Sequence, residues 1–191
     1  MRFGLPSLLV LALLALPAAA QTAAPSQAPG RAGYAQALDQ LFGTLHETQN
    51  ASEAQVLETK IRAIWSHDNS DDAVEALAKA SLALQIGDFK SAGPMLDQLV
   101  QEHPEFMEAW NRRATLYFVE GKFKESLADV DKVLAMEPRH FGALSGKGAI
   151  LRAQGKNAEA LAAMKDALAI DPFIPGLKDA VQEMEKAQPE L

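Results

Sequence analysis

The chain has 191 residues, enough for one domain of ordinary size, and 48% of them are hydrophobic, so that a packed core can form. Aromatic residues make up only 6%, and the abundance of alanine and leucine favours helices over strands. A formal net charge of -7 at pH 7 argues against broad nucleic-acid binding, and the absence of cysteine excludes disulfides, thiol catalysis and thiolate metal sites.

Residues 1–20 carry the pattern of a secretory signal peptide. Arg2 supplies a positive charge, residues 5–16 are almost entirely apolar, and small residues ending at Ala20 form a cleavage site. The alternative, a membrane anchor, requires about 20 apolar residues, and this apolar stretch is shorter. The pattern therefore predicts export, to the periplasm of a Gram-negative bacterium, with no membrane insertion after cleavage.

Residues 21–36 are rich in proline, glycine, alanine and polar residues, which predicts a flexible linker. From there onward apolar residues recur at helical spacing almost to the end of the chain, and no segment shows the alternation of a strand. Residues 37–69 are predicted to form a helical hairpin. Its two apolar faces consist of Leu38, Leu41, Phe42 and Leu45, and of Leu57, Ile61, Ile64 and Trp65.

An internal repeat with a period of 34 residues dominates the rest of the chain. Its three units span residues 73–106, 107–140 and 141–174. In each unit, small and apolar residues recur in fixed columns, a glycine divides the unit and a proline lies near its end. The aligned positions include Gly87, Gly121 and Gly155; Pro104, Pro138 and Pro172; Ala80, Ala114 and Gly148; and Ala92, Ser126 and Ala160.

The middle unit, with the sequence EAWNRRATLYFVEGKFKESLADVDKVLAMEP, resembles the tetratricopeptide repeat. The resemblance implies an all-α fold, a right-handed superhelical stack of helix-turn-helix hairpins. Glycine permits the left-handed turn that ends the first helix, and proline stops the second helix. Because stacked units need both ends covered, we expect the hairpin at 37–69 to be a degenerate repeat and residues 175–191 to form a capping helix and tail.

In this family the first helix of each repeat lines a concave surface, so the resemblance implies a peptide-binding groove there. Asn111 and Arg112 occupy positions where family members that bind peptide carboxylates carry polar and basic groups, and Arg152 adds a charge one repeat later. An arginine fork can donate two parallel hydrogen bonds to a carboxylate; an ordinary solvated charged surface is the alternative. The predicted groove residues are Asn111, Arg112, Thr115, Phe118, Gly142, Ser145, Gly146, Ala149 and Arg152.

Three neighbouring charged or basic residues receive separate interpretations. Arg139 and His140 lie at the adjoining turn between repeats and are expected to extend the basic cluster of the groove. Arg113 lies one position away from the groove face, toward the paired helix, and is expected to pair with Asp129 across its hairpin.

The segment GALSGKG at residues 142–148 has the glycines and lysine of a phosphate-binding loop but not its spacing, because only three residues separate Gly142 from Gly146. Gly148 falls in a small-residue packing column. Gly142 and Gly146 lie one helical turn apart on the predicted groove face, although a glycine inside a helix costs about 1 kcal/mol relative to alanine. They are predicted to leave this patch bare for a ligand backbone or a neighbouring side chain such as Arg112.

No catalytic, metal or cofactor site is predicted. The chain has no serine in a G-x-S-x-G turn and no pair of histidines spaced for a metal on one helix face. Its histidines are expected at the surface or in turns: His46, His67, His103 and His140.

The sequence thus indicates a non-catalytic scaffold of the cell envelope that binds a protein or peptide segment. One alternative is a structural protein that self-associates through Phe42 and Trp65 of the N-terminal hairpin. Another is an accessory subunit of an enzyme of cell-wall or outer-membrane assembly, which rests on family analogy alone.

Overall fold

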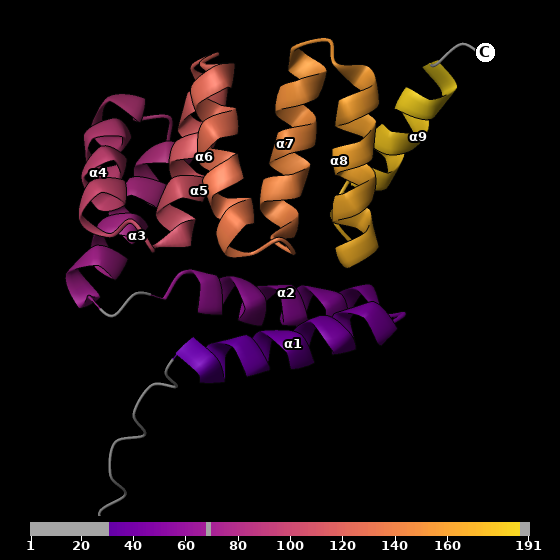
Figure 1. Cartoon of the computed structure of the whole chain (residues 1–191), viewed down its shortest axis with the longest axis horizontal. Coiled ribbons are helices and arrows are strands. Elements are labelled where there is room, and N and C mark those ends of the chain that lie inside the picture. The colour runs from indigo at the N-terminus through magenta and orange to yellow at the C-terminus, as the bar shows by residue number, and fades with distance from the viewer. Residues whose placement is uncertain (1–30, 68–69, 188–191) are drawn as a thin grey trace, which may run out of the picture.

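The computed structural model describes residues 31–67 and 70–187, and all regular secondary structure within them is α-helical, which confirms the predicted all-α fold. The predicted signal peptide and residues 21–30 of the predicted linker lie outside the described residues. The helices are α1 (Arg31–Glu47), α2 (Ala51–Trp65), α3 (Asp71–Gln85), α4 (Phe89–Glu102), α5 (Met107–Val119), α6 (Phe123–Met136), α7 (Phe141–Ala153), α8 (Asn157–Ile170) and α9 (Leu177–Ala187) (Figure 1).

Helix α1 begins earlier than predicted, at Arg31, so residues 31–36 are helical rather than part of the linker. Apart from Gly33, the residues of this first turn and a half tolerate a helix well. A tertiary contact also holds them in place, because the ring of Tyr34 lies 4.9 Å from the ring of His67 at the end of the hairpin. Composition alone could not distinguish such a helix start from a linker.

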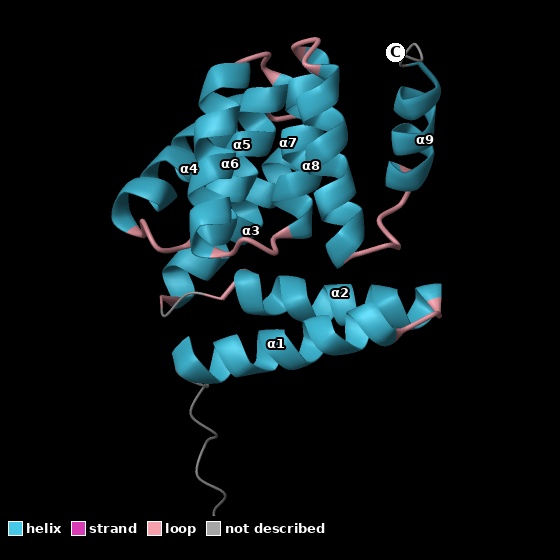
Figure 2. Cartoon of the chain, turned by 45° about the vertical axis from the view of Figure 1, so that its right-hand side comes forward, coloured by secondary structure: helices cyan, strands magenta, loops and turns pink. Residues whose placement is uncertain are grey.

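Three helix pairs, α3–α4, α5–α6 and α7–α8, form the repeat stack (Figures 1 and 2). Glycine ends the first helix of each pair with a positive φ, 77° at Gly87, 74° at Gly121 and 76° at Gly155. In the middle pair, the next N–H, from Lys122, donates to the carbonyl of Tyr117 at 2.8 Å. This backward hydrogen bond satisfies a terminal carbonyl of the helix, and it requires the left-handed residue that glycine supplies.

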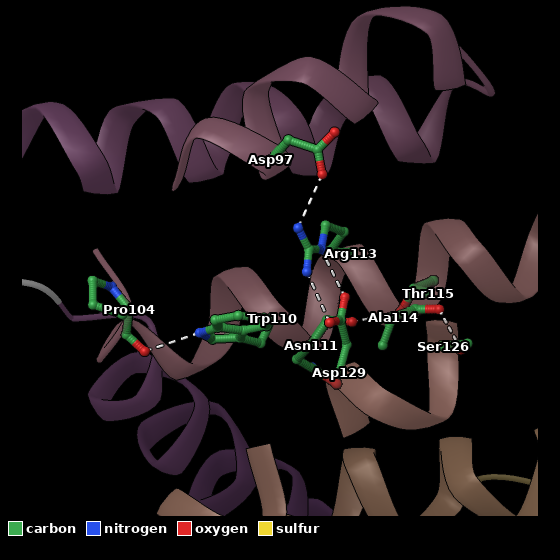
Figure 3. A network of polar contacts seen from close by, with 9 residues as sticks. All are labelled: Asp97, Pro104, Trp110, Asn111, Arg113, Ala114, Thr115, Ser126 and Asp129. Atoms are coloured by element: carbon green, nitrogen blue, oxygen red, sulfur yellow. Dashed lines mark hydrogen bonds and ion pairs between the residues drawn. The ribbon is translucent and has the colours of Figure 1, made fainter. Parts of the chain in front are cut away.

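The small-residue columns lie where the paired helices approach most closely. Ser126 is fully buried, and its hydroxyl donates to the carbonyl of Ala114 at 2.7 Å, so even the polar member of the column is satisfied (Figure 3). A side chain at Gly148 would collide with Met164 of α8. Gly148 is therefore a packing residue, as its column predicted.

The predicted pair of Arg113 and Asp129 is confirmed and is bidentate, with Nε–Oδ2 at 2.7 Å and Nη2–Oδ1 at 2.9 Å (Figure 3). The same guanidinium reaches Asp97 of the preceding repeat at 3.0 Å. It also lies over the ring of Trp110, whose indole N–H donates to the carbonyl of Pro104 at 3.0 Å. Arg113 thus joins the two helices of one repeat and also joins that repeat to its predecessor.

The N-terminal hairpin is present but does not stack beside α3 as a degenerate repeat, so that part of the prediction is wrong. Helices α1 and α2 lie across the ends of the repeat helices, at the bottom of both views (Figures 1 and 2). Their apolar faces pack on the turns that link the repeats and on the segment before α9. This shared core contains Leu38, Phe42, Leu45, Leu57, Ile61 and Trp65 from the hairpin, with Phe141, Ile170, Phe173 and Ile174 from the stack.

This placement removes the surface proposed for self-association, because Phe42 and Trp65 are buried within the chain. At the other end of the stack, α9 buries Leu177, Val181 and Met184 against α8 and covers the last repeat. In the part of the chain that the structure describes, no helix has the length and hydropathy needed to cross a membrane.

Candidate functional site

The first helices of the repeats, α3, α5 and α7, line a groove that contains three hollows. The first hollow, of about 540 Å³, lies between α3 and α5, and the central hollow, of about 200 Å³, lies between α5 and α7. The last hollow, of about 300 Å³, lies where α7 and α8 meet α9. Thr115 lines both the first and the central hollow, so these two adjoin.

The central hollow contains every predicted groove residue except Arg112 and Arg152. Sequence reasoning did not identify the remaining wall, which comes largely from the packing columns of α5, α6 and α7. A more complete prediction would have required knowing how far the groove extends between the helices, which helical periodicity does not show. The lining residues are Asn111, Ala114, Thr115, Phe118, Ser126, Val130, Gly142, Ala143, Ser145, Gly146, Ala149 and Ile150.

Glycine keeps the central hollow open. An added Cβ at Gly146 would meet no atom within 4 Å, so the hollow has free space at this position. An added Cβ at Gly142 would lie 3.3 Å from Cε1 of His140, so this glycine also makes room for the histidine ring. With apolar walls and a few hydroxyl and amide groups, the central hollow is suited to one apolar side chain of a ligand.

Arg112 lies in the first hollow, and its charge is partly neutralised by Glu108 one turn earlier on α5. Nη2 of Arg112 lies 2.7 Å from Oε1 of this buried glutamate. Oε2 of Glu108 accepts from Nδ2 of Asn111 at 3.1 Å and lies 3.3 Å from Nε2 of His140. Burial alone would raise the pKa of Glu108, but its bond to His140, the charge of Arg112 and the bond from Asn111 together lower that pKa.

Arg152 lies in the last hollow, with Asn157 of α8 and Glu183 of α9. The predicted cluster of Asn111, Arg112 and Arg152 is therefore not a single patch. The two arginines lie in different hollows, with the central hollow between them. Register placed both on the groove side of their helices, but it gave no distance along the groove.

Arg139 and His140 do not extend the basic surface of the groove, because both are engaged with the N-terminal hairpin. Arg139 bonds Asp39 of α1 at 2.7 Å and Glu137 at 3.0 Å, and its guanidinium lies over the ring of Phe42.

His140 lies in the turn before α7, as predicted, but it is buried there and is not part of an exposed basic surface. Its ring stacks on Trp65 at 3.9 Å, and its Nδ1 accepts the N–H of Ala143, so His140 caps α7. With Nδ1 accepting, the hydrogen bonds assign a ring proton to Nε2, which faces Glu108. His140 thus connects the hairpin, the start of α7 and the charged network behind the groove.

Among the described residues, no group of three or more histidine, aspartate or glutamate side chains is arranged to hold a metal ion. Arg112 and Asn111 instead bond Glu108, and the central hollow between the two arginines has mainly apolar walls. This arrangement can recognise a segment of chain by shape, by an apolar anchor and by charge at two separated positions.

Comparison with known proteins agrees with the repeat register. A tetratricopeptide repeat model matches residues 111–175, and the model "Tetratricopeptide repeat protein 21 ARM repeat" matches residues 14–130, more than half of the chain. A TPR repeat-containing protein of Rhizobium etli is 35% identical over 84 residues, which cover 44% of this chain and 41% of that protein. The chain therefore matches less than half the length of this relative.

Two solved structures show the same fold. The first TPR of Spaghetti (RPAP3), bound to an HSP90 peptide, superposes with a TM-score of 0.59 and 21% identity, over 63% of this chain and 96% of that chain. The TPR2B domain of yeast Sti1, in complex with an Hsp70 peptide, gives a TM-score of 0.53 and 22% identity, over 61% and 93%. The 34-residue register, the three glycine-ended hairpins and these matches lead to one conclusion: the chain belongs to the tetratricopeptide repeat family.

Proposed function

We propose that the chain is a non-catalytic module that binds a protein or peptide segment along its groove, with one apolar side chain seated in the central hollow. The observation that carries this proposal is the central hollow itself, an open space with apolar walls between α5 and α7. Gly146 supports it, because a glycine that meets nothing and weakens its helix has no packing role.

The charges on either side of the central hollow indicate which segments would fit. Arg112 and Arg152 lie in the flanking hollows, and both carry guanidinium groups that can bond carboxylates. Glu108 already bonds Arg112 at 2.7 Å, so an acidic group of the bound segment would compete with Glu108 for this arginine. Glu183 lines the same hollow as Arg152. We therefore expect an apolar anchor residue with acidic residues to either side. The structural neighbours from RPAP3 and Sti1 hold peptides of HSP90 and Hsp70 respectively, which supports a peptide role for this groove.

The experiment is photo-crosslinking in cells from a reactive amino acid placed at Thr115, at the junction of the first and central hollows. Gly146→Leu places a branched side chain in the hollow, starting from a Cβ position that meets no atom within 4 Å, and we expect it to abolish the specific crosslinked product. Gly43→Leu is the matched control, because an added Cβ at this exposed glycine of α1 also meets nothing within 4 Å. A product that persists unchanged in Gly146→Leu would remove the central hollow from the proposal.

We further propose that the protein acts in the bacterial periplasm after removal of residues 1–20. The basic, apolar and small-residue pattern of these residues supports export. Mass spectrometry of the protein from fractionated cells should find an N-terminus at Gln21 in the periplasmic fraction. An intact Met1 in the cytosolic fraction would contradict the proposed location and leave the groove proposal untouched.

A further inference from the structure

The first helix of each repeat carries a stripe of residues that faces the preceding repeat. In α5 the stripe is Ala109, Arg113 and Leu116, and in α7 it is Ala143, Lys147 and Ile150. Leu116 and Ile150 are each only 2% exposed, because α4 and α6 cover them. The equivalent residue of α3, Leu82, is 58% exposed.

This difference follows from the placement of the N-terminal hairpin, which lies across the ends of the repeat helices and leaves the outer face of α3 uncovered (Figure 1). The exposed stripe on this face consists of Glu75, Lys79, Leu82 and Ile86, and we call it the α3 edge. Ile86, just after the last turn of α3, is 71% exposed. Two large aliphatic side chains at helical spacing are therefore open to solvent at the end of a repeat stack.

A basic residue recurs at the middle position of the stripe, and in α5 and α7 it bonds an aspartate of the preceding repeat. Arg113 bonds Asp97 at 3.0 Å, and Lys147 bonds Asp131 at 3.0 Å; each aspartate precedes its partner by 16 residues and lies on the second helix of the preceding repeat. Lys79 occupies the same position in α3, but 16 residues earlier the chain has Ala63. Lys79 instead bonds Glu75 on its own exposed helix face at 2.7 Å.

The helix that covers α5 shows what fits such a stripe. Leu116 packs over Gly93, with its Cδ2 3.6 Å from the position of an added Cβ there, and Asp97 follows Gly93 by one turn. The two helices run in opposite directions, because residue 93 meets residue 116 and residue 97 meets residue 113. The next turn of the covering helix, near Val100, therefore lies opposite the position that is Ala109 in α5 and Glu75 in α3.

We propose that the α3 edge binds one amphipathic helix of another protein. This helix places a small or apolar residue over Leu82, an acidic residue four positions later against Lys79, and a basic residue about three positions further on, opposite Glu75. No exposed stripe on the described helices of this chain combines these three features, so a second copy does not supply the occupant. Leu82 also lines the first hollow beside Arg112, so the bound helix lies at the open end of the groove.

The probe is a peptide of the α4 sequence, residues 89–102, that carries Val100→Lys as the basic group. A staple through positions 94 and 98 on the outer face holds it helical, because an isolated helix of this length is unstable in water. Fluorescence anisotropy measures its binding to the whole mature chain. We expect saturable binding, and we expect Lys79→Glu in the protein to raise the Kd about tenfold or more. A peptide that carries Asp97→Lys should bind the Lys79→Glu protein with the original affinity, because the two charges have been exchanged. Leu82→Asp should also abolish binding, and Lys132→Glu, on the exposed face of α6, is the charge-matched control.

Three outcomes overturn the proposal. One is the absence of saturable binding up to about 1 mM, or a Kd that does not change with Lys79→Glu and Asp97→Lys. Another is a concentration-dependent dimer of the chain alone, seen by sedimentation and dissociated by Leu82→Asp, which would assign the α3 edge to a second copy. The third is loss of peptide binding in Gly146→Leu, which would place the peptide in the central hollow. Because Gly146→Leu blocks the central hollow and leaves the α3 edge intact, it also distinguishes failure of this proposal from failure of the proposed groove function.

Discussion

Gly146 and Gly148 lie two positions apart in α7, but they face different surroundings. Gly148 lies against Met164 and Ala160 of α8, whereas Gly146 borders the open central hollow. We expect Gly148→Ala to lower the free energy of unfolding by about 1–3 kcal/mol, because the added methyl overpacks the hairpin. Gly146→Ala should raise it by up to about 1 kcal/mol, because alanine favours the helix and meets no atom. Urea denaturation of both variants tests this, and equal effects of the two substitutions would contradict it.

Asp171 is one residue whose ionisation couples stability to pH. It is fully buried at the end of α8, and its Oδ1 accepts the N–H of Phe173 at 3.0 Å. Burial chiefly, with the nearby carboxylate of Glu58, raises its pKa to about 6 from an ordinary 3.8, although the Phe173 N–H and Arg62 act in the opposite direction. The folded protein therefore holds a proton on Asp171 at a pH where the unfolded chain has lost it.

The sign of the pH effect follows from this pKa. Stability is greatest below about pH 4 as far as this group is concerned, and it falls as the pH rises to about 6, by about 3 kcal/mol in total. Asp171→Asn keeps the acceptor for Phe173 and removes the titration. We expect the variant to gain stability over the natural protein between pH 4 and 7 in pH-resolved thermal denaturation. A constant difference between the two across this range would show that Asp171 does not titrate there.

At the scale of elements, Trp65 is a central contact between the N-terminal hairpin and the repeat stack. Trp65 packs on His140 and Phe141, at the start of α7, and lies beside Phe42 in its own hairpin. We expect Trp65→Ala to cost about 3–5 kcal/mol of stability and to release α1 and α2 first. Hydrogen exchange should then show lost protection in these two helices while α5 and α6 stay protected. Uniform loss across the whole chain would mean that hairpin and stack unfold as one unit.

The sequence could predict this hairpin but not its position. Helical periodicity identifies an apolar face, such as that of Leu38 and Phe42, but it does not identify the surface against which that face packs. The deciding residues were at the start of α7 and in the segment before α9, where Phe141 and Ile174 supply an apolar platform. The burial of His140 was missed for the same reason, because it depends on Trp65, which is 75 positions earlier in the sequence.

At the scale of the whole molecule, the repeat register predicted the stack and the groove-face residues of the central hollow, though not its deeper wall, because each repeat contacts chiefly its neighbours and so repeats one local geometry. The pair of Arg113 and Asp129 could be predicted because it lies within one hairpin. The separation of Arg112 from Arg152 could not, because it depends on how the concave face is divided by side chains across several repeats.

The same nearest-neighbour logic predicts an unequal distribution of stability along the stack. Helix α9 covers α8, with Lys165 bonded to Glu185 at 2.6 Å, and the hairpin braces the turns around Phe141 and Ile174. The first repeat, α3–α4, contacts a neighbouring repeat on one side only, and its other side is the exposed α3 edge with Leu82. A terminal repeat that lacks one interface opens at a lower free energy than its neighbours.

We therefore expect native-state hydrogen exchange to show the amides of α3 and α4 opening at a lower free energy than those of α5 to α8. Arg113→Lys provides a second readout, because lysine cannot hold Asp129 and Asp97 at once and the link between the first two repeats would weaken. In this variant protection should fall further in α3 and α4 than in α7 and α8. Equal opening free energies in all three repeats would mean that the stack opens as one cooperative unit despite its uncovered end.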